Sequence, residues 1–280
     1  TSKTCEPKPQ TKLPEQGLNV YEALFKTPVV EPADLAPLAR RGLNLLGLKS
    51  FDFELAQRLA DHARRESLQL DVILCPECYP HRLRWLGEGE LNHVGNFTLA
   101  ASLDDAAKQT WNQANARGEQ HPSFREYRNQ VLGPLQQQGS LAYPEQDFEM
   151  ELAYQAYADD PTPGPGYNAF LAGFNWSPRD FVRVFPWRER YVGRSTPLAD
   201  CDAHGDLAKW SPQLDHVRNV YLAPAAGYEH FLKAAEAGRV ACVIASPQGV
   251  ESGTTIYGSP EVVDYLKAHR AQWQWWEDER

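Results

Sequence analysis

The sequence predicts a single α/β domain folded as a distorted β/α barrel. Short apolar runs, ended by polar or turn residues, recur between amphipathic stretches, which is the pattern of βα units that feed a largely parallel sheet. The chain of 280 residues is long enough to bury one large core, and α/β barrels of this length commonly fold as one domain. No internal repeat divides it. We therefore expect one domain over residues 1–280.

The apolar periodicity gives the order of the expected elements. Helices are predicted at 32–41 and 53–66, and strands at 42–48, 70–74, 92–99, 170–174, 181–185, 218–222 and 240–245. Acidic Glu31 and Asp34 suit the start of the first helix, because carboxylates stabilise a helix N-terminus. The last predicted helix, 260–277, ends in three tryptophans, which we expect to dock it on the body of the domain.

The middle of the chain departs from the βα pattern. Residues 104–160 are rich in Gln, Glu and Asn, and apolar residues recur at helical spacing at Phe124, Tyr127, Val131 and Leu135. This spacing predicts a helical insertion in the barrel. The Pro- and Gly-rich stretch that follows predicts an irregular loop.

The opening segment 1–16 is rich in Lys, Pro and Gln and starts with Thr, so we expect it to be irregular. Such a start fits a mature chain after removal of a leader, and it equally fits a trimmed chain. The compartment therefore stays open, with a periplasmic or secreted location slightly favoured over the cytoplasm. Five cysteines in so large a chain do not indicate a disulfide framework.

The charge balance bears on the partners of the protein. The net charge is −9, from 28 basic and 37 acidic residues, so a nucleic-acid backbone gains little general attraction. No apolar stretch has membrane-spanning length. The sequence thus predicts a soluble domain with neither a nucleic-acid nor a membrane partner, and it leaves the oligomeric state open.

Candidate functional residues follow from the position of active sites in parallel β/α folds, at the carboxyl ends of strands. Glu77, His93, Asp202 and His204 are the four candidates. Two carboxylates and two imidazoles suit a divalent transition metal such as Zn, Mn or Fe. Such a metal lowers the pKa of a bound water to about 7 and makes hydrolysis feasible at neutral pH.

Structural explanations of the same residues stay open. Glu77 can end its strand in solvent, His93 can be a core histidine, and Asp202 can form a turn before Gly205. A carbohydrate-active barrel that uses strand-end carboxylates is another alternative, since eight tryptophans offer faces for sugar rings.

The order of motifs resembles the polymerase-and-histidinol-phosphatase (PHP) domain family. Segment 41–48 is similar to that family's second strand, 71–77 to its glutamate strand, and His93-Val94-Gly95 to its histidine-led strand. Asp202-Ala203-His204-Gly205 is similar to its "DAH" motif, and the strand 218–222 and the helix 229–238 follow in the family's order. Order and motifs together favour the resemblance more than any one motif does.

The resemblance implies a distorted barrel of the PHP type that hydrolyses phosphoesters with metal-bound hydroxide. Glu77, His93, Asp202 and His204 would be the metal ligands. The family's first histidine pair would fall at 19–25, where this chain has no histidine, and Lys49 stands where its "TDH" motif would follow a strand. A lysine there disfavours a neighbouring cation. We therefore expect a reduced site with one divalent ion or none.

The expected catalytic residues are Glu77, Asp202 and Lys49, and the expected substrate is a small anion. Arg194, Arg188 and Trp176 are the candidates for binding it, placed by strand-end position alone. The leading hypothesis is a metal-dependent, phosphoesterase-like hydrolase. A non-catalytic PHP-like domain that binds a ligand or a protein after losing its metals, and the carbohydrate-active barrel, are the alternatives.

Overall fold

The structure is a computed structural model of the chain. It describes residues 13, 17–28, 30–50, 52–78, 97–109, 112, 133–144, 169–177, 181–184, 196–202, 216–246 and 253–273. All statements below concern these residues.

The N-terminal third forms a βαβαβ unit. Its elements are β1 (Asn19–Thr27), α1 (Pro32–Arg40), β2 (Leu43–Leu48), α2 (Phe53–Arg65) and β3 (Asp71–Leu74). The three strands are parallel, with β2 between β1 and β3. Glu31 and Asp34 form a capping box at the start of α1, and the Asp52 side chain accepts a hydrogen bond from Leu55 N at the start of α2. The predictions for 32–48 and 53–74 are confirmed to within a residue or two.

The rest of the chain extends this sheet and adds a second one. The further strands are β4 (Glu77–Cys78), β5 (Phe97–Ala100), β6 (Leu141–Pro144), β7 (Ala169–Ser177), β8 (Phe181–Val184), β9 (Thr196–Asp200), β10 (Val217–Ala223), β11 (Val240–Ser246) and β12 (Gly253–Tyr257). The further helices are α5 (Gly133–Gln137), α9 (Tyr228–Glu236), α10 (Pro260–Ala268) and the 3-10 turn η6 (Arg270–Gln272). Strands β1, β4, β6, β9 and β12 were not among those expected from apolar periodicity.

The expected barrel is wrong: the main sheet is mixed and open. Its strand order is β12-β11-β10-β1-β9-β7-β8, and β2 and β3 branch from β1. Strand β1 pairs antiparallel with β10 through its first half and parallel with β9 at Phe25. Strands β10, β11 and β12 form an antiparallel meander. A closed β/α barrel needs parallel neighbours all round, and in the described residues no pairing joins β3 to β8 or β12.

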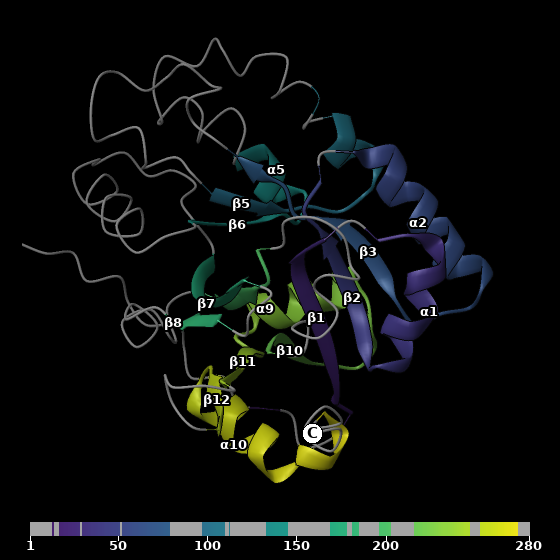
Figure 1. Ribbon diagram of the computed structural model, residues 1–280. Helices are drawn as coiled ribbons and strands as arrows, with labels where there is room; N and C mark the ends of the chain where they lie inside the picture. Colours follow the sequence, from purple (N-terminus) through teal and green to yellow (C-terminus); the bar gives the residue numbers. More distant parts are fainter. Residues whose placement is uncertain are drawn as a thin grey trace, which may run out of the picture.

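The second sheet has the order β4-β5-β6 and is antiparallel. It lies above the main sheet in Figure 1, beyond the ends of β2 and β3. Its strand β6 and helix α5 fall inside the segment 104–160, so strand pairing as well as helix is present in that part of the chain.

Helices cover the two faces of the βαβαβ strands, and alternate residues of each strand face them. Leu24, Leu46 and Val72 belong to the core cluster under α1 and α2. Their neighbours Phe25, Leu45 and Ile73 face the opposite way and pack in the cluster that contains α9. Figure 1 shows α1 and α2 on the right of these strands. This alternation follows from the period of two in a β-strand.

The C-terminal helix α10 covers the outer part of β10 and β11. Trp273 is 1% exposed, and its Nε1 donates a hydrogen bond to Leu266 O at 2.9 Å. The prediction that a terminal tryptophan docks the last helix is confirmed for Trp273, although the helix ends earlier than expected, at Ala268. Among the described helices, none combines the length and apolar character needed to cross a lipid bilayer.

Candidate functional site

Four charged side chains meet at the carboxyl ends of the parallel strands. Lys26 lies near the end of β1, Lys49 directly follows β2, Glu77 lies in β4 just after β3, and Asp202 follows β9. Because β1, β2, β3 and β9 run parallel, their carboxyl ends lie at one edge of the sheet. We call Lys26, Lys49, Glu77 and Asp202 the strand-end cluster.

The cluster is held by ion pairs. The Nζ atoms of Lys26 and Lys49 both lie 2.8 Å from Asp202 Oδ1. Lys49 Nζ also lies 3.0 Å from Glu77 Oε2, and Lys26 Nζ lies 3.7 Å from the same oxygen. Lys26 is fully buried, whereas Lys49, Glu77 and Asp202 keep between 13% and 18% of their side-chain surface exposed. The cluster therefore has one fully buried member and three members that are partly exposed.

Backbone contacts between β1 and β9 position two members of the cluster. Lys26 and Asp202 both have left-handed backbone conformations, with φ of 53° and 40°. Between them, Cys201 N donates to Phe25 O at 3.0 Å, and Cys201 Sγ donates to the carbonyls of Phe25 and Lys26. Left-handed φ is uncommon outside glycine and is kept only where the surroundings impose it.

Lys49 and Glu77 are positioned by the ends of β2 and β3. Lys49 N donates to Thr27 O at 3.1 Å, which continues the β1–β2 pairing past the end of β2. Cys75 N donates to Leu48 O at 2.7 Å. Glu77 then enters β4 and pairs with Thr98. The two side chains thus project from neighbouring strand ends.

A third carboxyl group, that of Asp200, lies beneath the cluster. It is fully buried at the last position of β9, and its Oδ2 accepts a hydrogen bond from Tyr143 OH at 3.0 Å. Its Oδ1 has no hydrogen-bond partner among the described atoms. Burial raises the pKa of Asp200 to about 7, although the charge of Lys26 opposes this shift. Near neutral pH, Asp200 is therefore partly protonated.

Asp202 behaves in the opposite way. Burial alone would raise the pKa of Asp202, but the charges of Lys26 and Lys49 and their hydrogen bonds outweigh burial and hold the pKa well below its usual range. Burial, together with the charges of Asp200 and Asp202, raises the pKa of the Cys201 thiol well above its usual range. Asp202 is thus ionised at neutral pH. Cys201 is a neutral thiol that donates hydrogen bonds to backbone carbonyls.

The described residues do not fit a metal ion at Glu77 and Asp202. No group of three or more His, Cys, Asp or Glu side chains in the described part of the chain is placed to hold one. A carboxylate oxygen offers two lone pairs, so two ammonium donors on one oxygen already use both. Here two ammonium groups lie on Asp202 Oδ1.

The sequence-predicted site residues divide into two sets. Glu77, Asp202 and Lys49 are brought together in the cluster. His93, His204, Arg188 and Arg194 lie outside the described residues, as does the side chain of Trp176, whose backbone belongs to β7. Their roles as metal ligands or substrate contacts stay predictions.

Sequence reasoning missed Lys26, Asp200 and Tyr143. Lys26 follows the apolar run Ala23-Leu24-Phe25, and a lone lysine at the end of a buried strand is the signal that would have found it. Asp200 stands two residues before Asp202, which is a visible pair of carboxylates at a strand end. Tyr143 carries no comparable signal, since it reaches Asp200 from the second sheet.

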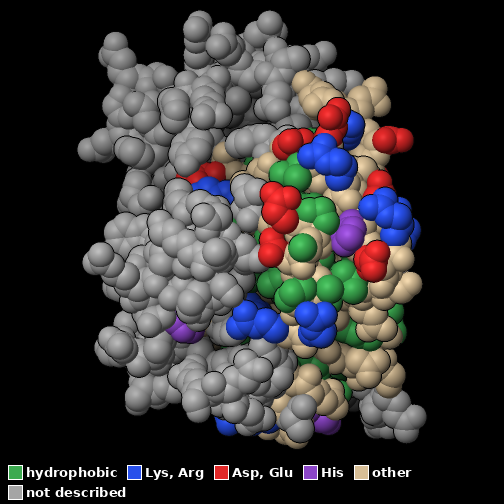
Figure 2. All heavy atoms as spheres, turned by 45° about the vertical axis from the view of Figure 1, so that its right-hand side comes forward, with side chains coloured by type: hydrophobic (Ala, Val, Ile, Leu, Met, Phe, Trp, Pro, Cys, Tyr) green, Lys and Arg blue, Asp and Glu red, His purple; other side chains and the backbone are tan. Residues whose placement is uncertain are grey.

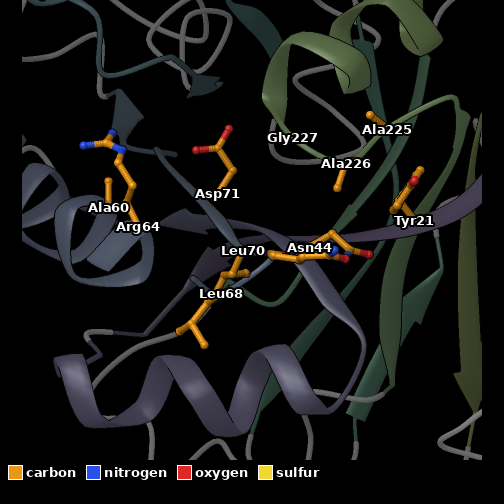
Figure 3. A pocket seen from close by; sticks show the side chains of 11 residues that line it. Tyr21, Asn44, Ala60, Arg64, Leu68, Leu70, Asp71, Ala225, Ala226 and Gly227 are labelled. Carbon is orange, nitrogen blue, oxygen red and sulfur yellow. The ribbon is translucent and has the colours of Figure 1, made fainter. Parts of the chain in front are cut away.

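A cavity of about 490 Å³ lies at the opposite end of the same strands. Figure 3 shows Tyr21, Asn44, Asp71 and Gly227 around it. Its polar side chains already serve the fold: Asn44 accepts from Glu22 N and donates to Gln69 O, and Asp71 Oδ2 accepts from Tyr228 N at the start of α9. We therefore assign this cavity a structural role.

The surface that carries α1 and α2 shows no accumulation of one charge. In Figure 2, acidic and basic side chains alternate over the described part of this face. Arg64 and Asp61 of α2 form such a pair, with Nη1 and Oδ1 2.8 Å apart and both side chains exposed. Surface pairs of this kind contribute little free energy. This face therefore offers no charged patch among its described residues that would compete with the strand-end cluster as a candidate site.

The fold of this chain is similar to that of one solved structure, although no sequence comparison gave a match. No family model matches the sequence, and no curated protein matches it. A crystal structure from Bacteroides vulgatus, of a two-domain protein containing a predicted PHP-like metal-dependent phosphoesterase, is similar with a TM-score of 0.55 and 12% identity. The match covers 95% of this chain and 74% of that one. At this identity the likeness shows a common fold, which agrees with the PHP resemblance at the level of the fold.

Proposed function

We propose that the strand-end cluster is the functional site of this chain, and that it binds and hydrolyses a small phosphoester. The observation that carries the proposal is the convergence of Lys26, Lys49, Glu77 and Asp202 at the carboxyl ends of parallel strands. The similar fold of a protein containing a predicted PHP-like metal-dependent phosphoesterase supports the substrate class.

The partly exposed members of the cluster supply the groups that such a reaction needs. The Lys49 ammonium is a point charge with three donors and is suited to a phosphate oxygen. It can turn one donor to the substrate while Lys26 keeps Asp202 paired. Glu77 is the base we assign for the attacking water: water adds to phosphorus, its proton passes to Glu77, the ester P–O bond breaks, and the leaving oxygen takes a proton from solvent.

A second candidate function is binding of the same small phosphate compound without turnover. It is favoured by the charge balance of the cluster, in which two ammonium groups face two carboxylates. Both carboxylates already contact ammonium groups, so a carboxylate that takes the proton of water gives up such a contact. The two candidates share the site and the ligand class and differ in turnover.

One experiment separates the candidates. We would measure turnover of 4-nitrophenyl phosphate and a panel of natural phosphoesters, and the thermal shift caused by inorganic phosphate, for the wild type, Glu77→Gln and Lys49→Met. The control is Lys233→Met, since among the described residues Lys233 pairs with exposed Glu229 on α9 alone. Turnover lost in Glu77→Gln supports hydrolysis. A phosphate shift that is lost in Lys49→Met, with no turnover, supports binding. If the wild type shows neither turnover nor a phosphate-induced thermal shift, both candidate functions are contradicted.

A further inference from the structure

We propose that Lys26 and Lys49 take the place of a divalent metal between Glu77 and Asp202, so that this site operates with a built-in pair of cations. The inference rests on the proposed function only for the location of the site. It concerns the source of positive charge and does not depend on which ligand binds or whether it is hydrolysed.

The hydrogen-bonding capacity of Asp202 supports the proposal. A carboxylate oxygen offers two lone pairs, and Asp202 Oδ1 has ammonium donors from Lys26 and Lys49 at 2.8 Å each. A metal bound to this oxygen would lie beside both ammonium groups. Like charges at such separations repel strongly wherever solvent screening is poor, and Lys26 is fully buried.

The second carboxylate faces the same two cations. Glu77 Oε2 lies 3.0 Å from Lys49 Nζ and 3.7 Å from Lys26 Nζ. The two ammonium groups therefore lie between Glu77 and Asp202, where a bridging ion would have to be. Together they carry two positive charges, which is the charge of one divalent cation. Among these four described side chains, two carboxylates and two ammonium groups balance in charge.

The placement of Lys26 is specific to this role. A lysine is rarely buried unless it is paired, and Lys26 is fully buried and paired with Asp202. Its backbone adopts a left-handed φ of 53°, and that of its partner Asp202 adopts 40°. Two uncommon backbone conformations at the two ends of one ion pair indicate that the pair is imposed by the fold.

The test compares metal response in proteins with and without the ammonium groups. Protein with its affinity tag removed, purified without chelator, is subjected to elemental analysis. Its unfolding midpoint is then measured with EDTA, with MnCl2 and with ZnCl2. The variants are Lys49→Met, whose side chain is partly exposed, and the double variant Lys26→Met, Lys49→Met. Methionine keeps much of the length of lysine and removes its charge. Lys233→Met on the surface of α9 is the matched control.

The expected wild-type result is a metal content far below one ion per chain and an unfolding midpoint that neither EDTA nor metal changes. Removal of both lysines leaves the carboxylates of Glu77 and Asp202 without these two cations. Added Mn or Zn should then raise the unfolding midpoint of the double variant, because a ligand that binds the native state stabilises it. Lys49→Met should show a smaller rise, and Lys233→Met none.

Two results would overturn the inference. One is about one equivalent of metal in the wild type, with a midpoint that falls in EDTA and recovers with metal. The other is a folded double variant with no metal response. The wild-type measurement decides even where the double variant does not fold. A wild type that neither turns over phosphoesters nor responds to phosphate would overturn the proposed function. It would leave these metal results standing.

Discussion

Lys26 Nζ lies 2.8 Å from Asp202 Oδ1, and both residues hold left-handed backbone conformations. The pair joins the end of β1 to the segment after β9, and the fully buried Lys26 has its charge compensated there. The ion pair therefore fixes the geometry of the strand-end cluster.

The first prediction concerns the loss of this pair. Lys26→Met leaves Asp202 without its buried partner, and removal of one member of a buried pair typically costs about 3 kcal/mol or more. Urea unfolding followed by circular dichroism should show a loss of this size. The exposed pair on α9 is the comparison, and Lys233→Met should change stability by less than about 0.5 kcal/mol. Equal small effects in both variants would contradict a structural role for Lys26.

The second prediction concerns pH. The folded pKa of Asp200 is about 7, above the ordinary value of 3.8, so the folded state holds a proton that the unfolded state releases between these values. The free energy of unfolding should fall as the pH rises from about 4 to about 7, with a slope of at most about 1.4 kcal/mol per pH unit from this group. Asp200→Asn should flatten that decline.

Asp202 provides an internal contrast in the same titration. Its pKa is lowered in the folded state, so the stability it contributes is present above about pH 4 and is lost as the pH falls below that value. The acid loss should therefore survive in Asp200→Asn. Chemical unfolding at several pH values measures both effects, and an unchanged slope between pH 4 and 7 in the variant would contradict the assignment to Asp200.

The third prediction concerns Gly47 in β2. A side-chain carbon at this position would overlap Cys75 Sγ and approach Phe25 Cδ1 to 2.9 Å. Gly47→Ala should destabilise the protein by about 1–3 kcal/mol, the usual cost of overpacking a core. In a double-mutant cycle, Cys75→Ala should recover part of this loss, because it removes the sulfur atom. Additive effects of the two substitutions would show that the overlap is relieved elsewhere.

The fourth prediction concerns the start of helix α9. Asp71 at the first position of β3 accepts a hydrogen bond from Tyr228 N at 2.9 Å and so acts as a cap from another element. Asp71→Ala should cost about 1 kcal/mol, as is typical of a lost N-terminal cap. Asp71→Asn retains an acceptor oxygen and should cost less. Thermal unfolding of the two variants side by side measures the difference.

The helices and most strands of this fold were predictable, because each has a local signal. The capping box at Glu31 and Asp34 and the apolar faces of 43–48 and 71–74 are readable from the sequence. Closure of the sheet was not readable. Closure depends on whether β10 pairs with β1 antiparallel or parallel. A largely apolar segment such as 217–223 is compatible with both directions.

The candidate site was predictable in part for the same reason. Glu77 and Asp202 are acidic groups next to apolar runs, and Lys49 directly follows one. Lys26 lies within β1 itself, and β1 was not recognised as a strand because Tyr21, Glu22 and Lys26 interrupt its apolar pattern. Glu22 is buried there with Arg218 at 3.2 Å. Polar residues whose partners lie far away in the sequence give no local signal.

Strand β1 also determines when the protein can finish folding during synthesis. It pairs early in the chain with β2, but its other neighbours, β9 and β10, belong to the last third of the sequence. A nascent chain that emerges from the ribosome therefore displays one side of β1 unpaired until residues 196–223 have been made. Unpaired edges and distant partners slow folding and favour association with other chains. Glu22 and Lys26 are charged residues of β1. Charges on an unpaired strand disfavour its pairing with another chain, and these two are present before β9 and β10 have been synthesised.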